Sequence, residues 1–245
     1  MSGHSHWATI KHKKGAADAR RGKLWSKLAR AIQTAAKEGG GNPDMNIKLQ
    51  NAIADAKAES MPRDVIERSI KRGTGELEGV SYEQVTYEGY GPGGSALMVD
   101  ALTDNKNRTA AEMRKMFEAS GGNLGGAGSV AFMFQRKGLL SIPVSAAGED
   151  QMMNDVLDAG AENLETAGDH YFITCAVPDF EAVKKALSAK YAFAGSELTM
   201  IAKDRMKVDE ETGRKILNLM EALDDNEDVQ KVYTNFELPE TLAKS

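Results

Sequence analysis

The order of hydrophobic periods between Gly138 and Lys203 constrains the fold of this chain more than any other feature. Strand-like and helix-like patterns follow one another in six segments: strand 139–144, helix 149–159, strands 161–166 and 170–177, helix 179–190 and strand 197–202. The order strand–helix–strand–strand–helix–strand predicts a split βαβ, or ferredoxin-like, unit that is complete in itself.

The segment after this unit is too short to fold alone. Residues 204–240 carry one helical stripe, from Ile216 to Leu223, and one strand pattern, from Val229 to Phe236. About thirty residues do not bury a core of their own. We therefore expect residues 204–240 to join residues 79–137 in one discontinuous α/β domain, with residues 138–203 inserted into it.

The first half of that domain has strong turn signals. β-formers at 84–90 and 95–102 flank Gly91-Pro92-Gly93-Gly94, which predicts a hairpin. A helix is expected over 107–120, with Thr109 as N-cap and Glu112 completing a capping box. The glycine-rich run 121–128 then leads into a predicted strand, Ser129–Gln135.

The first third of the chain reads as helical. Helices are expected over 17–37, 46–58 and 62–72, and Gly73-Thr74-Gly75 ends the last of them. Residues 1–16 have no clean period and are expected to form a poorly ordered arm. The predicted fold class is α+β: a basic three-helix domain (1–78), then two α/β domains (79–137 plus 204–240, and 138–203), one ferredoxin-like and inserted into the other.

Charge is distributed very unevenly along the chain. Residues 1–72 hold fifteen Lys/Arg and seven Asp/Glu, whereas residues 73–245 hold sixteen and twenty-nine, for a net charge of −5 overall. Between Ser2 and Arg30 there are eight Lys/Arg against one acid, and both tryptophans, Trp7 and Trp25. Clustered cations beside aromatic rings are typical of surfaces that hold phosphates and stack on bases. A solvated helix face with a flexible tail is the alternative.

This pattern predicts a nucleic-acid interface at the front of the chain. Its expected residues are Trp7, Lys11, His12, Lys13, Lys14, Arg20, Arg21, Lys23, Lys27 and Arg30. A weaker second group, Lys106 and Arg108, lies at a predicted helix N-terminus, where free backbone N–H groups attract anions.

The other residues that could form a metal, phosphate or catalytic site are better explained as structural residues. The histidines of the arm lack fixed geometry for a metal, and the glycine runs 89–96 and 121–128 lack the ending of a phosphate-binding loop, although the second is a candidate contact loop. Cys175 lies in an apolar strand and is expected to be buried and inert. The acids Asp224, Asp225, Glu227 and Asp228 are expected to form a solvated turn. We predict no catalytic residue, metal, cofactor or small-molecule substrate.

The compartment follows from what the chain lacks. Its apolar runs are shorter than the roughly 18 residues of a membrane helix, and the basic N-terminus has no apolar signal region. A single cysteine excludes an internal disulfide. These features predict a cytoplasmic protein without a membrane partner.

Three stretches resemble one known family. GHSHWATIKHKKGAADARRGK, YEGYGPGGSALMVDALTDNKNRT and GGNLGGAGSVAFMF are similar to the YebC/PmpR family, in the same order and across the whole chain. Trp25 stands where a Phe is more usual, and GGAGSV stands where a Thr or Ser is expected. The resemblance implies a helical domain and two α/β domains, and a role with nucleic acid.

The resemblance leaves the target open. Family members are described as regulators that bind promoter DNA, and others as translation factors that act at the ribosome and assist elongation through proline stretches. The leading expectation is therefore a non-enzymatic, DNA-binding transcriptional regulator. The alternatives are a ribosome- or ribosomal-RNA-associated factor, and a protein-interaction module to which the arm adds electrostatic affinity.

Overall fold

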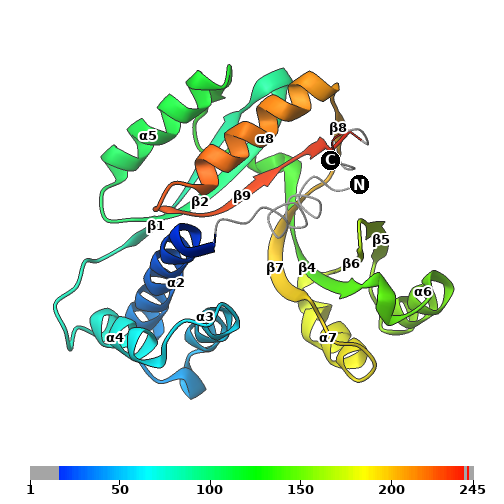
Figure 1. Cartoon of the computed structure of the whole chain (residues 1–245), viewed down its shortest axis with the longest axis horizontal. Coiled ribbons are helices and arrows are strands. Elements are labelled where there is room, and N and C mark those ends of the chain that lie inside the picture. Colours follow the sequence, from blue (N-terminus) through cyan, green and yellow to red (C-terminus); the bar gives the residue numbers. More distant parts are fainter. Residues whose placement is uncertain (1–16, 240–241, 243–245) are drawn as a thin grey trace.

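The computed structural model describes residues 17–239 and residue 242, with side chains from Arg21 onward. The helices are α2 (Ala17–Gly39), α3 (Ile47–Ala58), α4 (Arg63–Thr74), α5 (Lys106–Ala119), α6 (Glu149–Asp158), α7 (Phe180–Ser188) and α8 (Glu210–Asp224). The strands are β1 (Glu83–Tyr90), β2 (Ala96–Thr103), β3 (Asn123–Leu124), β4 (Phe134–Pro143), β5 (Asn163–Ala167), β6 (His170–Cys175), β7 (Gly195–Ala202), β8 (Met206–Lys207), β9 (Val229–Thr234) and β10 (Phe236–Glu237). Figure 1 shows their arrangement.

Helices α2, α3 and α4 form the helical unit, which packs around its own core. Ile32, Leu49 and Ile66 are buried there. Gly73 on α4 allows the closest approach, because a Cβ atom at this position would lie 2.4 Å from the carbonyl oxygen of Gln33 on α2. Trp25 packs against the same core and donates its indole N–H to the carbonyl of Glu59 at 3.0 Å, so it serves packing rather than base stacking. The three predicted helices are confirmed.

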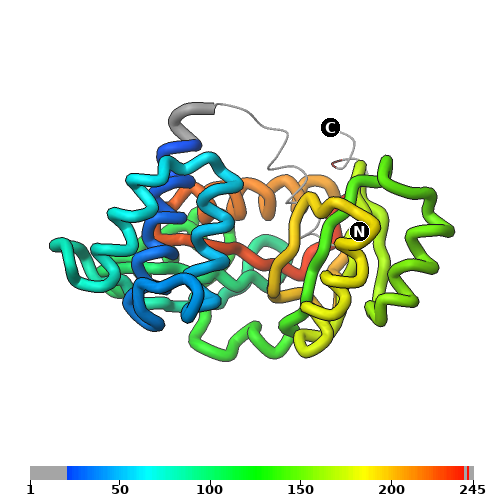
Figure 2. The backbone as a smooth tube through the Cα atoms, turned by 90° about the horizontal axis from the view of Figure 1, so that it is seen from below, coloured from blue at the N-terminus to red at the C-terminus, as the bar shows by residue number. Residues whose placement is uncertain are grey.

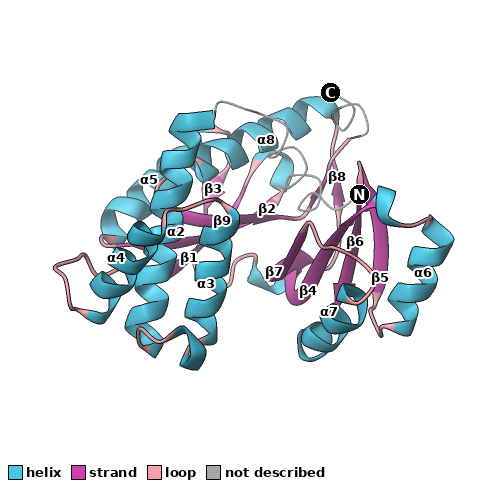
Figure 3. Cartoon of the chain, turned by 60° about the horizontal axis from the view of Figure 1, so that its bottom comes forward, coloured by secondary structure: helices cyan, strands magenta, loops and turns pink. Residues whose placement is uncertain are grey.

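The central sheet combines distant parts of the chain. Its strand order is β3-β1-β2-β9; β1 and β2 form the predicted antiparallel hairpin, and β9 pairs with β2. Helices α5 and α8 lie side by side on one face (Figures 1 and 3). Their apolar stripes meet the sheet in one core, in which Leu97, Val99, Phe117, Leu219 and Val232 are buried. Strand β9 thus completes a sheet begun more than a hundred residues earlier, and α8 covers it.

Strands β4, β5, β6 and β7 with helices α6 and α7 form the ferredoxin-like unit, and the short strands β8 and β10 pair separately in parallel. The strand order of the ferredoxin-like unit is β5-β6-β4-β7, with antiparallel pairing throughout, and α6 and α7 cover one face (Figure 3). Leu140, Met152, Ile173 and Val183 are buried between sheet and helices, together with Cys175 as expected. The predicted α+β fold class is confirmed.

One strand replaces two that the sequence predicted. Strands were expected at 129–135 and 139–144, but the chain turns through Ala131–Met133 and then runs without interruption as β4. Gly138 does not end a strand; it lies within β4 where Phe180 packs closely against the backbone. The predicted domain boundary at 137/138 therefore falls inside a strand. The paired strands β4 and β7 run from beside the central sheet, where Phe134 packs with Met98 and Tyr233, into the ferredoxin-like unit (Figure 1).

The N-cap of α5 also differs from the prediction. Asn105 is the cap, since its side-chain oxygen accepts the backbone N–H of Arg108 at 3.1 Å. Thr109 is fully buried in the first turn, and its hydroxyl bonds to Thr103 and to Asp228. The expected capping box from Thr109 to Glu112 is therefore wrong.

Candidate nucleic-acid interface

The predicted interface residues fall into three sets. Five of them lie outside the described residues: Trp7, Lys11, His12, Lys13 and Lys14. Arg20 belongs to α2, but its side chain is outside the described part, and Arg21 is exposed on the next position. The side chains of Lys23, Lys27, Arg30, Lys106 and Arg108 all have defined partners.

Lys23, Lys27 and Arg30 form one stripe along α2. Their spacing of four and three residues places them on one face of a helix. That face meets the turn 224–228, which joins the end of α8 to the start of β9. Figures 1 and 2 show the start of β9 passing beside α2. We call Lys23, Lys27 and Arg30 the basic stripe and residues 224–228 the acidic turn. The basic stripe contacts the acidic turn of the same chain.

Two lysines contact the first half of the acidic turn. Lys27 donates its ammonium to the backbone carbonyl of Asp224, and its Nζ lies 3.5 Å from Oδ1 of the same residue. Lys27 is only 8% exposed, and a lysine is rarely so buried unless it has a charged partner, which here is Asp224. Lys23 lies further out, with its Nζ 3.7 Å from Oδ1 of Asp225. The contact is thus buried at its centre and exposed at its rim.

Arg30 contacts the second half of the turn. Its Nη1 donates to Oδ1 of Asp228 at 2.6 Å, and its Nη2 lies 3.2 Å from Oε2 of Glu227. The guanidinium also stacks over the ring of Tyr82, 5.2 Å from its centre. Arg30 is therefore held by two carboxylates and an aromatic face, as a guanidinium commonly is at an interface.

Asp228 is the residue on which the contact converges. Its second carboxylate oxygen, Oδ2, accepts from Nη2 of Arg108 at 2.7 Å and from the hydroxyl of Thr109 at 2.6 Å, and the residue is 3% exposed. Burial raises the pKa of Asp228, but the hydrogen bonds of Thr109 and Arg108 and the charge of Arg30 outweigh it and hold that pKa below its usual value. Arg108 also pairs with Asp104 at 2.8 Å, and its own pKa is raised by these acids.

The prediction of a solvated turn holds for Asp225 and Glu227, which are exposed, but not for Asp228. Asp228 is buried, and three cations from α2 and one from α5 neutralise the turn. The prediction failed because it considered the acids locally, whereas their partners lie almost two hundred residues earlier. Within residues 17–239, no group of three His, Cys, Asp or Glu side chains is arranged to hold a metal ion.

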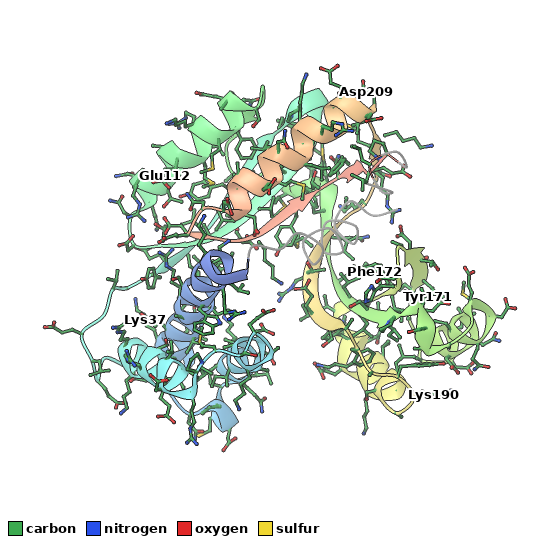
Figure 4. The ribbon with its side chains drawn as sticks, in the orientation of Figure 1. Lys37, Glu112, Tyr171, Phe172, Lys190 and Asp209 are labelled. Carbon is green, nitrogen blue, oxygen red and sulfur yellow. The ribbon has the colours of Figure 1, made fainter. Side chains whose placement is uncertain are left out.

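Lys106 does not belong to this cluster. Its Nζ pairs with Oε2 of Glu83 at 2.5 Å, and this hydrogen bond and the lysine's charge lower the pKa of Glu83. Lys37, labelled in Figure 4, lies near the end of α2 and donates to the hydroxyl of Ser81 at 2.5 Å. The two residues predicted at the start of α5 therefore have different surroundings: Arg108 joins the basic stripe at Asp228, and Lys106 does not.

The glycine-rich loop is organised by a buried carboxylate. Glu88 is 7% exposed and accepts backbone N–H groups from Gly128, Val130 and Ala131 at 2.7 to 2.9 Å. Burial raises the pKa of Glu88, and the three hydrogen bonds lower it further than burial raises it. The loop presents the ring of Phe132 to solvent. Sequence reasoning missed Glu88, because nothing local marks an acid in a strand as the acceptor for a loop forty residues away.

No helix in the described part of the chain is long and apolar enough to span a bilayer.

The ion pairs of the predicted interface residues are concentrated in one place, where the basic stripe of α2 meets the acidic turn. The sequence held two signals for this contact: cations at i, i+4 and i+7 on one helix, and a run of acids at 224–228. Opposite charges clustered in two segments of one chain indicate that the segments can pair.

Comparison with known proteins accounts for nearly the whole chain. A family model described as "TACO1/YebC protein N-terminal domain" matches residues 5–76, and one described as "TACO1/YebC second and third domain" matches residues 82–236. The chain is similar to a crystal structure of a conserved hypothetical protein from Aquifex aeolicus, with a TM-score of 0.85, 43% identity, and coverage of 96% of this chain and 97% of the other.

Curated relatives share full-length similarity. A protein of Desulfosudis oleivorans is 51% identical over 100% of both chains, and one of Treponema pallidum is 49% identical over 99% of this chain and 100% of its own. Both bear the name "Probable transcriptional regulatory protein". The two family models together cover both the helical unit and the two sheet-containing units, and the chain belongs to the TACO1/YebC family.

Proposed function

We infer that this protein regulates gene expression by binding nucleic acid, and that its leading target is DNA in transcriptional control. The observation that carries this proposal is the concentration of eight Lys/Arg against one acid in residues 2–30 of a chain whose net charge is −5. Such a segment attracts polyphosphate, and the acidic remainder disfavours nonspecific contact. The names of the relatives support a regulator of gene expression.

The proposed contact residues are the ten predicted from residue 7 to residue 30. The contact residues before α2 would bind along the phosphate backbone, and those on α2 would bind phosphates at the first half of that helix. Phosphate contacts supply affinity and a strong dependence on salt, but no sequence information.

One observation favours a second candidate, a structured RNA such as ribosomal RNA. Helices α3 and α4 are joined by a short turn, as in a DNA-reading pair, but Arg63 and Arg68 on α4 pair with Glu67 and Asp64 at 2.7 Å. Acids of α4 itself therefore balance these two cations, which weakens the case for base readout by α4. The proposal therefore keeps translation at the ribosome as its alternative and protein interaction alone as a second alternative.

The test compares two variants with equal changes in charge. In the first, Lys11, Lys13, Lys14, Arg20 and Arg21 are each changed to Gln. In the matched control, five exposed cations outside residues 1–30 are changed to Gln: Lys115, Arg136, Lys185, Lys203 and Lys207. Affinity for a mixed-sequence DNA duplex and for a single-stranded RNA of the same sequence is measured by fluorescence anisotropy between about 50 and 200 mM salt.

The arm variant should lose affinity, and the slope of its log–log salt plot on DNA should become shallower by about 4.5 if its five cations each neutralise one phosphate. The control variant should keep the wild-type slope. Equal losses in the two variants would contradict the proposal. Crosslinking in cells followed by sequencing of the attached nucleic acid distinguishes DNA from ribosomal RNA.

The structure also determines which truncation is informative. Deleting residues 1–30 would remove more than half of α2, including Trp25 and Leu28, which pack in the helical core. Deleting residues 1–16 instead leaves α2 whole. If the protein is an interaction module, partner capture should survive this deletion, whereas the proposal expects nucleic-acid binding to fall.

A further inference from the structure

The helical unit is joined to the rest of the molecule mainly through charge. Its apolar core is built from residues 25–70, and the core of the central sheet from residues 85–242, so no apolar cluster of described residues includes members from both. Residues 75–81 connect the two and are exposed, including Leu77 and Val80. The pairs between the basic stripe and the acidic turn are therefore the principal side-chain contacts that hold the helical unit in place.

The acidic turn offers the same chemistry as a phosphate backbone. Four carboxylates within five residues, with the carbonyl oxygens of Asp224 and Glu227, supply closely spaced anionic and neutral acceptors to a helix stripe of two lysines and an arginine. Lys and Arg bind phosphate oxygens through equivalent charge-assisted hydrogen bonds.

We propose that the acidic turn is an intramolecular competitor of nucleic acid. In the closed arrangement it occupies Lys23, Lys27 and Arg30, and a polyphosphate takes its place when the helical unit moves away on the exposed connection 75–81. This inference rests on the proposed function, because it describes how the same cations become available.

When the helical unit moves away from the acidic turn, Asp228, the most buried acid of the turn, still has hydrogen-bond partners. Asp228 keeps Arg108 and Thr109, both on α5, when Arg30 departs. An unpaired buried carboxylate would make opening very costly, and this second set of partners removes that obstacle. Arg30, in contrast, loses both its carboxylates and needs another anion, so polyphosphate should open the contact more effectively than simple salt at equal ionic strength.

The first test weakens the turn at its exposed rim. Asp225 and Glu227 have side chains 62% and 66% exposed, so we expect Asp225→Asn with Glu227→Gln to preserve the fold, which circular dichroism checks. The matched control, Asp158→Asn with Glu181→Gln, makes the same charge change on exposed acids of α6 and α7. Affinity is measured for the DNA duplex and the single-stranded RNA described above, with the full-length protein.

The turn variant should bind about fivefold more tightly than wild type, because each exposed pair contributes modestly to closure and the competent fraction rises accordingly. The control should change affinity less than twofold. Equal gains in both variants would show a general effect of charge and overturn the proposal. If wild type binds neither probe at about 50 mM salt, the proposed function itself fails and this inference with it.

The second test locks the contact reversibly. Lys23→Cys and Asp225→Cys place thiols at a pair whose charged atoms lie 3.7 Å apart, and a cleavable bis-maleimide can join them while Cys175 stays buried. The linked protein should bind the probes several-fold more weakly than the same protein after cleavage of the linker. Unchanged affinity on cleavage, in a protein that binds nucleic acid, would refute the competition while leaving the proposed function intact.

Discussion

At the scale of single residues, Asp228 shows how one side chain can serve three parts of a fold. One carboxylate oxygen accepts from Arg30 of the helical unit, and the other accepts from Arg108 and Thr109 of α5, while the residue itself precedes β9. These bonds compensate the burial of its charge, which would otherwise be unfavourable.

Replacing Asp228 by Asn should destabilise the protein by about 2 kcal/mol, since the charge-assisted bonds to two arginines weaken while both arginines remain. Chemical unfolding measures this change. The variant should also lose the part of the pH dependence of stability that Asp228 contributes. A carboxyl whose pKa is lowered on folding stabilises the native state above its unfolded pKa of about 3.9, and that contribution disappears as the pH falls through the folded value.

The free energy of unfolding of the wild type should therefore fall more steeply from about pH 5 to pH 2 than that of Asp228→Asn. Asp158→Asn, an exposed acid on α6, serves as the control and should keep the wild-type slope. Identical slopes for wild type and Asp228→Asn would contradict the role of this carboxylate.

At the scale of elements, the structure separates what local patterns predict from what they do not. Apolar spacing predicted α2, α3 and α4, and β-forming residues around a glycine–proline turn predicted the hairpin of β1 and β2, because these signals lie within a few residues of each other. The cap of α5 was misplaced by four residues: Asn105 and Thr109 are both good capping types, and only the buried contact to Asp228 decides between them.

Non-local contacts explain the other differences. The prediction divided β4 into strands 129–135 and 139–144, with Gly138 between them, but this glycine lies within the strand because the ring of Phe180 packs against it. The partners of the acidic turn and of Glu88 were missed for the same reason, since charge complementarity across the fold leaves no period in the sequence. The cations before α2 and their contacts stay a prediction.

Gly138 gives the sharpest test at this scale. A Cβ atom there would lie 2.3 Å from Cδ2 of Phe180 and 2.7 Å from Sγ of Cys175. Gly138→Ala should therefore destabilise the protein by about 1–3 kcal/mol through overpacking. Gly126→Ala, which has open space around it, is the control and should change the free energy of unfolding little. Equal unfolding midpoints for the two variants would argue against tight packing at β4.

At the scale of the whole molecule, the helical unit has a core separate from that of the rest of the chain, so we expect the two parts to differ in local stability. The helical unit has a small core of its own, whereas the central sheet and the ferredoxin-like unit are joined by β4 and β7 and by a shared cluster that includes Met98, Phe134 and Tyr233. Small units bury a smaller fraction of their surface.

Native-state hydrogen exchange should therefore find lower opening free energies for amides of α3 and α4 than for those of β2 and β4. The variant Asp225→Asn/Glu227→Gln should lower the protection of α3 and α4 further and leave β4 unchanged. Uniform protection across the chain would mean that the molecule opens as one cooperative body.

The pairing of β4 with β7 also suggests how such an architecture arises. Phe134 lies opposite Ala202, so the chain enters and leaves the ferredoxin-like unit at adjacent points on two antiparallel strands. The whole unit thus occupies the position of a hairpin loop. A single gene insertion at one turn would have been enough to add it, and its removal, with a short turn closing the gap, would leave the sheet of β1, β2 and β9 with unbroken connectivity.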